Sequence, residues 1–117
     1  LAYSCAGCSS AARIANDLAV RLYRERYADM SCIAGVGGDF APLMKTATSG
    51  RSILVIDGCP LECASKSLEH HGVTPNRHVN LAIRGVAKEY HSDYDDDQAD
   101  AGFEALVEEV ECADVSV

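Results

Sequence analysis

The segment at residues 52–57, which reads SILVID, constrains the fold of this chain more than any other segment. Its four apolar residues are consecutive, so a strand at this position has apolar side chains on both faces. Such a strand has to be covered on both sides, which is typical of a central strand in a parallel sheet. The segment therefore predicts an α/β fold in which helices pack on both faces of a mainly parallel sheet.

Further strands and helices are expected around this segment. The strands are predicted at residues 1–3, 30–33 and 79–84, and the helices at 10–27, 60–71, 103–110 and, after a cap at Asp39, near Pro42. Residues 79–84 alternate between apolar and polar side chains, which indicates an edge strand with one solvated face. Short connections between alternating strands and helices indicate right-handed βαβ units. We therefore expect a small three-layer sandwich whose four-stranded sheet has the order 2-1-3-4.

The charged residues divide the chain into two parts. All ten Lys and Arg residues lie in residues 1–88 with seven of the 18 acidic residues, so this part carries a net charge of +3. The last 29 residues carry 11 acidic residues and no Lys or Arg. We expect an α/β cysteine-cluster domain at residues 1–90 and an acidic segment at 91–117 that belongs to the same domain. The amphipathic helix of this segment is predicted to pack near the arginine face of the first helix.

Length and composition narrow the class of protein. With 117 residues, of which 48% are hydrophobic, the chain is expected to form one domain. No apolar run approaches the roughly 18 residues of a membrane span, so we expect a soluble, cytoplasmic protein that does not enter a membrane. The net charge of −8 disfavours nucleic acid as a partner, because phosphate binding depends on an excess of Lys and Arg. The sequence identifies no protein partner or small-molecule ligand.

Five of the six cysteines follow predicted strands. Cys5 and Cys8 form a CxxC after the first strand, Cys32 ends the second strand, and Cys59 and Cys63 form a CxxxC after the third. The carboxyl ends of parallel strands open onto one edge of a sheet, so these five residues are expected to form a cluster. The sixth cysteine, Cys112, lies in the acidic segment, where the sequence indicates no partner for it.

The expected cluster favours a metal site. A closed set of four Cys ligands is the usual mark of a structural zinc, so we predict Zn²⁺ as the bound metal. Two alternatives stay open. A CxxC between a strand and a helix is also the arrangement of thiol-disulfide oxidoreductases, and four thiolates also suit an iron–sulfur cluster. Whether the chain is an enzyme is left open by these patterns.

Asp57 ends the central strand immediately before Gly58 and Cys59. A carboxylate in this position is expected to accept N–H bonds from the following turn or to orient a metal ligand. The histidines are expected to cap helices or to lie on the surface rather than to bind metal. They are His70, His71, His78 and His91.

The glycine-rich run at residues 35–38 does not form a nucleotide-binding motif. Phe40 stands where the GxGxxG pattern requires its third glycine, and no P-loop sequence occurs in the chain. We expect these glycines to allow close backbone packing beside the cysteine cluster.

Four segments of the chain resemble the DGC domain family, which is named after its Asp-Gly-Cys motif. They read YSCAG at residues 3–7, MSCIAGVGG at 30–38, IDGCPLECA at 56–64 and GVAK at 85–88. The resemblance implies a zinc-binding protein of bacteria or archaea. It also implies four chelating residues, which fall on Cys5, Cys32, Cys59 and Cys63. Cys8 is then a fifth candidate, which could exchange into the site or resolve a disulfide.

Overall fold

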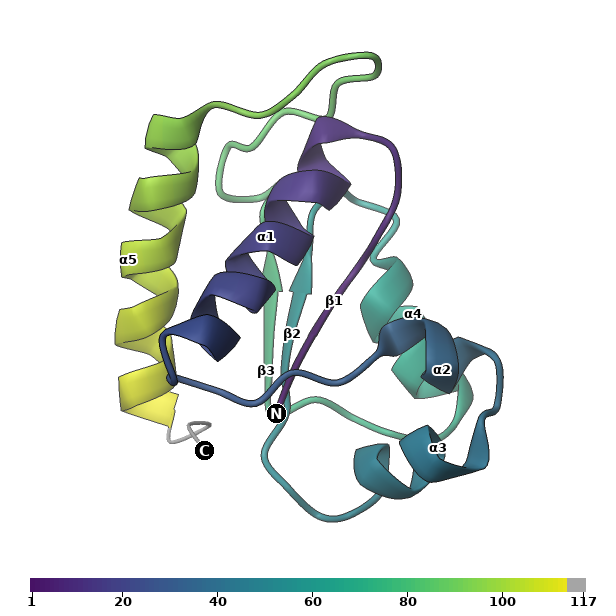
Figure 1. Cartoon of the computed structure of the whole chain (residues 1–117). Coiled ribbons are helices and arrows are strands. Elements are labelled where there is room, and N and C mark those ends of the chain that lie inside the picture. Colours follow the sequence, from purple (N-terminus) through teal and green to yellow (C-terminus); the bar gives the residue numbers. More distant parts are fainter. Residues whose placement is uncertain (114–117) are drawn as a thin grey trace.

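Within the described residues, the chain forms a sheet of three parallel strands with helices around it (Figure 1). The computed structural model describes the backbone of residues 1–113 and the side chains of residues 1–111. The elements in chain order are β1 (Ala2–Ser4), α1 (Ser10–Arg24), α2 (Ile33–Gly37), α3 (Ala41–Ala47), β2 (Leu54–Asp57), α4 (Cys63–His70), β3 (Arg77–Asn80) and α5 (Asp96–Ala113). None of the helices in this part of the chain combines the length and the apolar character needed to cross a membrane. The predicted α/β class is confirmed.

β2 is the centre of the sheet. Its four residues are all buried, and it pairs in parallel with β1 on one side and with β3 on the other. The central position predicted from the SILVID run is therefore confirmed. β3 lies at the edge of the sheet, as the alternating pattern predicted. Its two exposed residues, Arg77 and His78, precede that pattern.

The expected four-stranded sheet is not confirmed, because residues 30–33 do not form a strand. Only one of them makes an isolated bridge to β1. The bridge joins Met30 to Ala2, and the chain then turns directly into α2, whose N-cap is Cys32. Too few of these residues are extended to build a ladder of hydrogen bonds. The last strand is also shorter than predicted, because β3 ends at Asn80 and residues 81–85 form consecutive turns.

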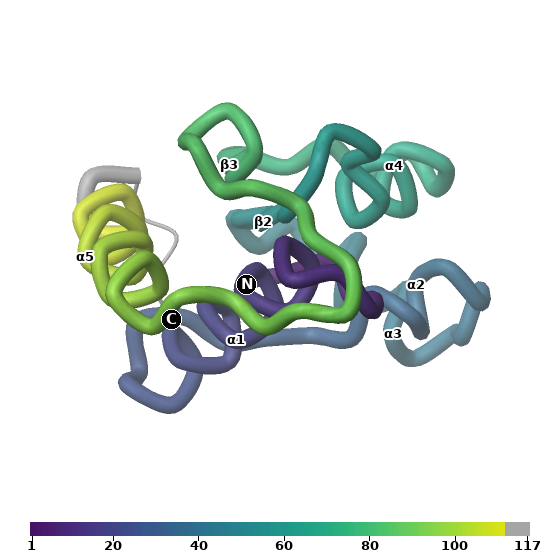
Figure 2. The backbone as a smooth tube through the Cα atoms, turned by 90° about the horizontal axis from the view of Figure 1, so that it is seen from above, coloured from purple at the N-terminus to yellow at the C-terminus, as the bar shows by residue number. Residues whose placement is uncertain are grey.

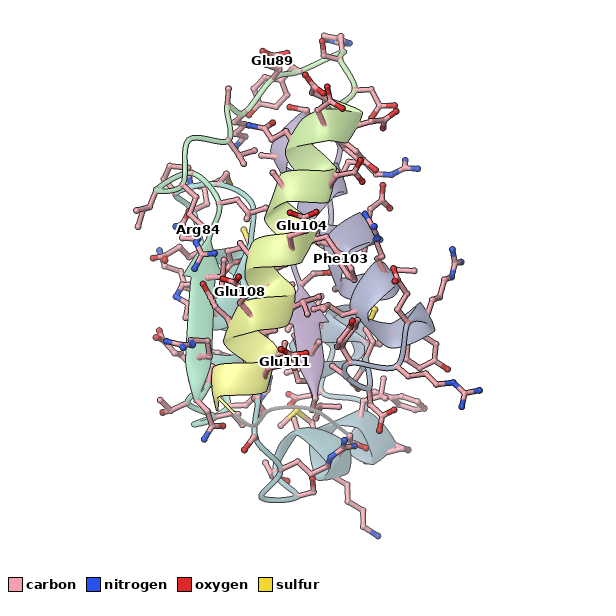
Figure 3. All side chains as sticks on the ribbon, turned by 90° about the vertical axis from the view of Figure 1, so that its left-hand side faces the viewer. Arg84, Glu89, Phe103, Glu104, Glu108 and Glu111 are labelled. Atoms are coloured by element: carbon pink, nitrogen blue, oxygen red, sulfur yellow. The ribbon has the colours of Figure 1, made fainter. Side chains whose placement is uncertain are left out.

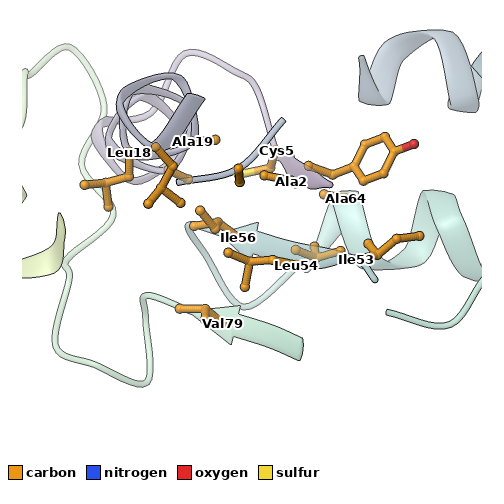
Figure 4. Close-up of a cluster of buried hydrophobic side chains, with 14 of the residues drawn as sticks. Ala2, Cys5, Leu18, Ala19, Ile53, Leu54, Ile56, Ala64 and Val79 are labelled. Atoms are coloured by element: carbon orange, nitrogen blue, oxygen red, sulfur yellow. The ribbon is translucent and has the colours of Figure 1, made fainter. Parts of the chain in front are cut away.

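The helices form a layer on each side of the sheet. α1 and α5 lie on one side, while α4 lies on the other together with α2 and α3 (Figure 2). This is the arrangement that a strand buried on both faces requires. Apolar side chains of the sheet meet those of the helices in the core, including Leu18 from α1, Ile56 from β2 and Ala64 from α4 (Figure 4).

The predicted start of α1 is confirmed, although the helix ends at Arg24 and not near residue 27, and the starts of α3 and α5 differ from the prediction. The hydroxyl of Ser9 caps α1 by accepting a hydrogen bond from the Ala12 N–H at 3.2 Å. At α3 the N-cap is Phe40 rather than Asp39. α5 begins at Asp96, well before the apolar spacing that predicted it, and acidic residues in its first turn suit the positive end of the helix.

The acidic segment packs on α1 through α5. Arg21 of α1 forms an ion pair with Asp100 of α5 at 2.9 Å, and the Arg21 guanidinium lies 4.0 Å from the centre of the Phe103 ring. Phe103 points toward α1, whereas Glu104 and Glu111 are exposed on the outer face of α5 (Figure 3). The predicted packing of this helix near the arginine face of α1 is therefore confirmed.

Candidate functional site

Four cysteines line one cavity at the carboxyl edge of the sheet. Cys5 follows β1, Cys8 lies in the loop before α1, Cys59 follows β2, and Cys63 is the first residue of α4. The cavity has a volume of about 200 Å³, and we name it the thiol pocket. Its lining includes Cys5, Cys8, Cys59, Cys63, Leu61, Lys88 and Tyr90.

Cys5 lies deep between α1 and the sheet, with only 6% of its surface exposed (Figure 4). Its sulfur accepts a hydrogen bond from the Gly58 N–H at 3.2 Å. Burial raises the pKa of Cys5 to about 11, although the Gly58 hydrogen bond opposes the rise, and the charge of Asp57 adds to it. Unless a metal ion binds to it, Cys5 is therefore a neutral thiol at neutral pH.

Gly58 precedes Cys59, which lines the thiol pocket, and lies against the first turn of α1. A Cβ atom at this position would lie 2.0 Å from the carbonyl oxygen of Ala11, which is far inside van der Waals contact. Glycine is therefore required here for space. The close approach brings the end of β2 to the start of α1, and with it Cys59 to the loop that holds Cys5 and Cys8.

Asp57 holds the start of α4. The residue is fully buried, and its carboxylate accepts the N–H bonds of Ala64 at 2.9 Å and Ser65 at 3.2 Å. These N–H groups belong to the first turn of α4, so Asp57 caps the helix from the end of β2. The predicted role of Asp57 as an acceptor of N–H bonds is confirmed. Because the Asp57 carboxylate binds the N–H groups of Ala64 and Ser65, α4 begins at Cys63 and not at Pro60, where its start was predicted.

His78 is exposed, as expected of a surface histidine, but its ring also forms a hydrogen bond with the buried Asp57, which the sequence did not predict. Its Nε2 atom lies 2.9 Å from the Asp57 carboxylate, and its Nδ1 atom lies 3.5 Å from that of Glu62. Glu62 also accepts a hydrogen bond from the side-chain amide of Asn80 at 3.2 Å. Two side chains of β3 therefore hold the connection between β2 and α4, which carries Cys59 and Cys63.

The loop after β3 brings Lys88 to the thiol pocket. Ser10 at the start of α1 fixes this loop, because its hydroxyl accepts the Glu89 N–H and its own N–H donates to the Glu89 carbonyl, both at 2.9 Å. A hydrogen bond with Tyr90 raises the pKa of Lys88, and the neighbouring Cys59 adds to the rise. Lys88 is thus a cation beside the thiols. The sequence pattern gave no sign of this role, although Lys88 ends the GVAK segment.

Cys32 lies in a second cavity, which has a volume of about 500 Å³ and which we name the Cys32 pocket. Its lining includes Ser4, Asn16, Val20, Arg24, Cys32 and Ile33. Ala6 lines both cavities, so they are neighbours at the end of β1. The structure therefore brings four of the five candidate cysteines together and leaves Cys32 apart. Cys112 falls outside the residues whose side chains the structure describes.

Comparison with known proteins identifies the family. The sequence model of the DGC domain matches residues 1–106. The chain belongs to the DGC domain family. A similar protein is the "Anaerobic and virulence modulator AnvM" of Pseudomonas aeruginosa, which is 50% identical over 106 residues, or 91% of this chain and 81% of that protein. No solved structure matches the chain.

Each residue of the Asp-Gly-Cys motif has a different task in this DGC domain. Asp57 caps α4, Gly58 permits the close approach of β2 to α1, and Cys59 lines the thiol pocket. The first two residues position the third, together with Cys63 at the start of the capped helix. The motif is therefore a unit that delivers two thiols to one cavity.

The thiol pocket of the DGC domain fits a zinc ion by the chemistry of its donors, because free Cys residues are preferred Zn²⁺ ligands. In their present positions, no three His, Cys, Asp or Glu side chains of the described residues are arranged to hold one ion. Cys8 and Cys63 are exposed, whereas Cys5 and Cys59 are buried. A common ion would therefore require the two exposed side chains to turn toward the two buried ones.

The remaining motifs that the sequence singled out line neither pocket of the DGC domain. Most of the glycine-rich run forms α2, where a Cβ at Gly35 would lie 1.9 Å from a methyl group of Leu43 in α3. The close contact is therefore with a side chain and not, as expected, between backbones beside the cysteine cluster. His70 and His71 lie at the end of α4 as expected. His91 is exposed.

Proposed function

We propose that this DGC domain is a zinc-binding regulatory domain whose thiol pocket holds one Zn²⁺. The observation that carries the proposal is the convergence of four free cysteines on a single small cavity. The four come from two segments of the chain that are far apart in the sequence, residues 5–8 and 59–63. Zn²⁺ in a closed set of thiolates has no redox chemistry of its own and serves to fix such segments together.

The proposal has two versions, which differ only in the fourth zinc ligand. Both include Cys5, Cys59 and Cys63. The fourth donor is Cys32 if the family resemblance is followed, and Cys8 if the shared cavity is followed. We favour Cys8, because it lines the same cavity as the other three donors. Cys32 would have to leave a separate cavity to reach them.

The surroundings of the thiol pocket support a site of several thiolates. Such a set keeps a net negative charge even with Zn²⁺ bound, and Lys88 provides a positive charge next to Cys59. The Gly58 N–H already donates to the sulfur of Cys5. Groups that donate to a ligand atom or fix its orientation are typical neighbours of metal ligands, and they tune the affinity of the site.

The regulatory part of the proposal rests on the relative from Pseudomonas aeruginosa, whose name describes an anaerobic and virulence modulator. We infer that this chain is also a modulator and that its zinc has a structural role. A zinc ion that ties residues 5–8 to residues 59–63 would hold the exposed Leu61 in place at the rim of the pocket, near the exposed Tyr90. A fixed rim of this kind suits a protein that acts through contacts with other molecules.

Metal analysis of the full chain, purified without oxygen, tests the proposal. We expect about one zinc per chain and a colourless protein. Iron with sulfide and a brown colour would instead indicate an iron–sulfur cluster in the same pocket. Metal-free protein with a reversible disulfide between pocket thiols would support a thiol-disulfide oxidoreductase. Either of the last two results would overturn the zinc proposal.

Three single substitutions identify the donors. Cys59→Ser and Cys8→Ser are expected to lose their zinc during dialysis against a weak chelator, whereas Cys32→Ser keeps about one zinc per chain. Loss in Cys32→Ser and retention in Cys8→Ser would make Cys32 the fourth donor. Retention in all three variants would overturn the thiol pocket as the metal site. Circular dichroism of each variant separates loss of metal from loss of fold.

A further inference from the structure

The Cys32 pocket has the size and place of a small-molecule site. Its volume of about 500 Å³ lies within the range of roughly 300–1,000 Å³ that is typical of such sites. It lies at the carboxyl end of β1, the edge of the sheet at which α/β folds bind ligands. Val20, Met30 and Ile33 give it an apolar wall, and Met30 and Ile33 also pack on the core. The hydrophobic core therefore holds this wall of the pocket in place.

The Cys32 pocket carries a positive charge that no carboxylate of the described residues pairs with. No Asp or Glu of the described residues lines the pocket, whereas Arg24 does. Among the described residues, the arginines with a carboxylate partner are Arg13, Arg21, Arg51, Arg77 and Arg84. Arg24 and Arg26 have none within that part of the chain. Of these two, only Arg24 lines the pocket.

Asn16 adds a hydrogen-bond donor to the same cavity. Its side-chain oxygen accepts a hydrogen bond from the hydroxyl of the buried Ser4 at 3.2 Å, which fixes the orientation of the amide. An amide has separate donor and acceptor ends, so the Nδ2 group remains as a donor. It has no hydrogen-bond partner in the described part of the chain. The polar side of the pocket thus presents two donors, Arg24 and Asn16, and no negative charge.

We propose that the Cys32 pocket binds a small organic carboxylate with an apolar body. Arg24 and the Nδ2 group of Asn16 donate to the carboxylate oxygens, as guanidinium and amide donors do in charge-assisted hydrogen bonds. The apolar body lies along Val20 and Ile33. This site is distinct from the thiol pocket and does not depend on zinc. The exposed Cys32 becomes covered when the ligand binds, so its thiol reports occupancy.

Octanoate serves as the probe, and octanamide is its neutral match of the same size. The rate at which iodoacetamide alkylates Cys32 is followed by mass spectrometry of the Cys32 peptide, with the full chain as purified. Octanoate is expected to slow this reaction several-fold and to leave the alkylation of Cys8 unchanged. Octanamide is expected to protect Cys32 much less. Equal protection by the two compounds, or no protection by octanoate, would overturn the proposal.

Arg24→Met and Arg26→Met are a matched pair, because both arginines are exposed and lie two positions apart at the end of α1. Arg24→Met is expected to raise the dissociation constant of octanoate by up to about fivefold, the scale of one exposed charge pair. Arg26→Met should leave it unchanged. An equal loss in both variants would show general attraction to a basic surface and would overturn the site. The zinc content of the same samples tests the thiol pocket separately.

Discussion

The two cavities at the end of β1 place cysteines in opposite surroundings. The chain is closely packed beside the thiol pocket, where Asp57 and Cys5 are buried and Gly58 leaves no room for a side chain. The Cys32 pocket is larger, about 500 Å³ against about 200 Å³, and Cys32 is exposed at the start of a helix of five residues. A shared sheet edge thus brings cysteines near one another, but local packing decides which of them form one site.

The polar groups of the two regions also differ in whether they have partners within the chain. Beside the thiol pocket, the carboxylates of Asp57 and Glu62 have partners within the chain, notably His78. In the Cys32 pocket, the guanidinium of Arg24 has no carboxylate partner in the described residues. Polar groups that are satisfied internally hold side chains in place, whereas unsatisfied ones are available to a ligand. The first region is therefore built to present its thiols and the second to receive a molecule.

The largest effect is expected from Gly58→Ala, which disturbs the close packing of β2 on α1 beside the thiol pocket. The added methyl group would lie 2.0 Å from the carbonyl oxygen of Ala11. Because that atom belongs to the backbone, α1 and β2 have to move apart. We expect the free energy of unfolding to fall by about 3 kcal/mol, the upper end for overpacking, as measured by urea denaturation.

Gly37→Ala is the matched control beside the Cys32 pocket. Nothing lies within 4 Å of a Cβ at this position, and Gly37 ends α2, where alanine is the better helix former. We expect a change of less than about 1 kcal/mol, in the stabilising direction. If Gly58→Ala were as stable as Gly37→Ala, close packing would not distinguish the surroundings of the thiol pocket from those of the Cys32 pocket, and the comparison would lose its basis.

Local sequence patterns were sufficient for the elements whose causes are local. The consecutive apolar residues of β2 predicted its central position, and the start of the helix predicted at residues 10–27 agrees with α1, because burial on two faces and the start of a helix are both readable from neighbouring residues. The N–H-accepting role of Asp57 was readable for the same reason. Its place between a strand and a helix start leaves a carboxylate few other partners.

Contacts between distant segments could not be read from the sequence. His78 reaches Asp57 through the register of β3 on β2, in which it pairs with Val55. Lys88 reaches the thiol pocket because Ser10, far earlier in the chain, holds the following loop. The separation of Cys32 from the other thiols has a similar cause. The chain turns into α2 immediately after Cys32, so the segment that was expected to extend the sheet leaves it after one bridge.

The next largest effect is expected in the chemical reactivity of the two kinds of cysteine in metal-free protein. Burial raises the pKa of Cys5 from 9.0 to about 11. At pH 8 its thiolate fraction is therefore about a hundredfold lower than that of an unperturbed thiol. Cys32 is exposed. We expect iodoacetamide to modify Cys32 early and Cys5 last, as followed by peptide mass spectrometry. Equal rates for the two would show that Cys5 is not enclosed.

The same shift has a consequence for stability at high pH. The pKa of Cys5 is higher in the folded than in the unfolded chain, so the neutral thiol contributes stability that is fully present below about pH 9. That contribution is lost as the pH rises from about 9 to about 11. Urea midpoints measured across this range should fall less in Cys5→Val, whose side chain does not ionise, than in Cys32→Ser. A parallel fall in the two variants would contradict the assignment to Cys5.

The smallest effect is expected at the contact between α1 and α5, which lines neither pocket and serves as a reference for both. Arg21 and Asp100 lie 2.9 Å apart, but their side chains are 41% and 66% exposed, so water screens the pair. Asp100→Asn should lower the free energy of unfolding by about 0.5 kcal/mol, and by less at high salt. Its zinc content and its protection of Cys32 by octanoate should not change. If either did, α1 would transmit a change from its middle to its start, and the two pockets would be coupled through that helix rather than set by their local packing.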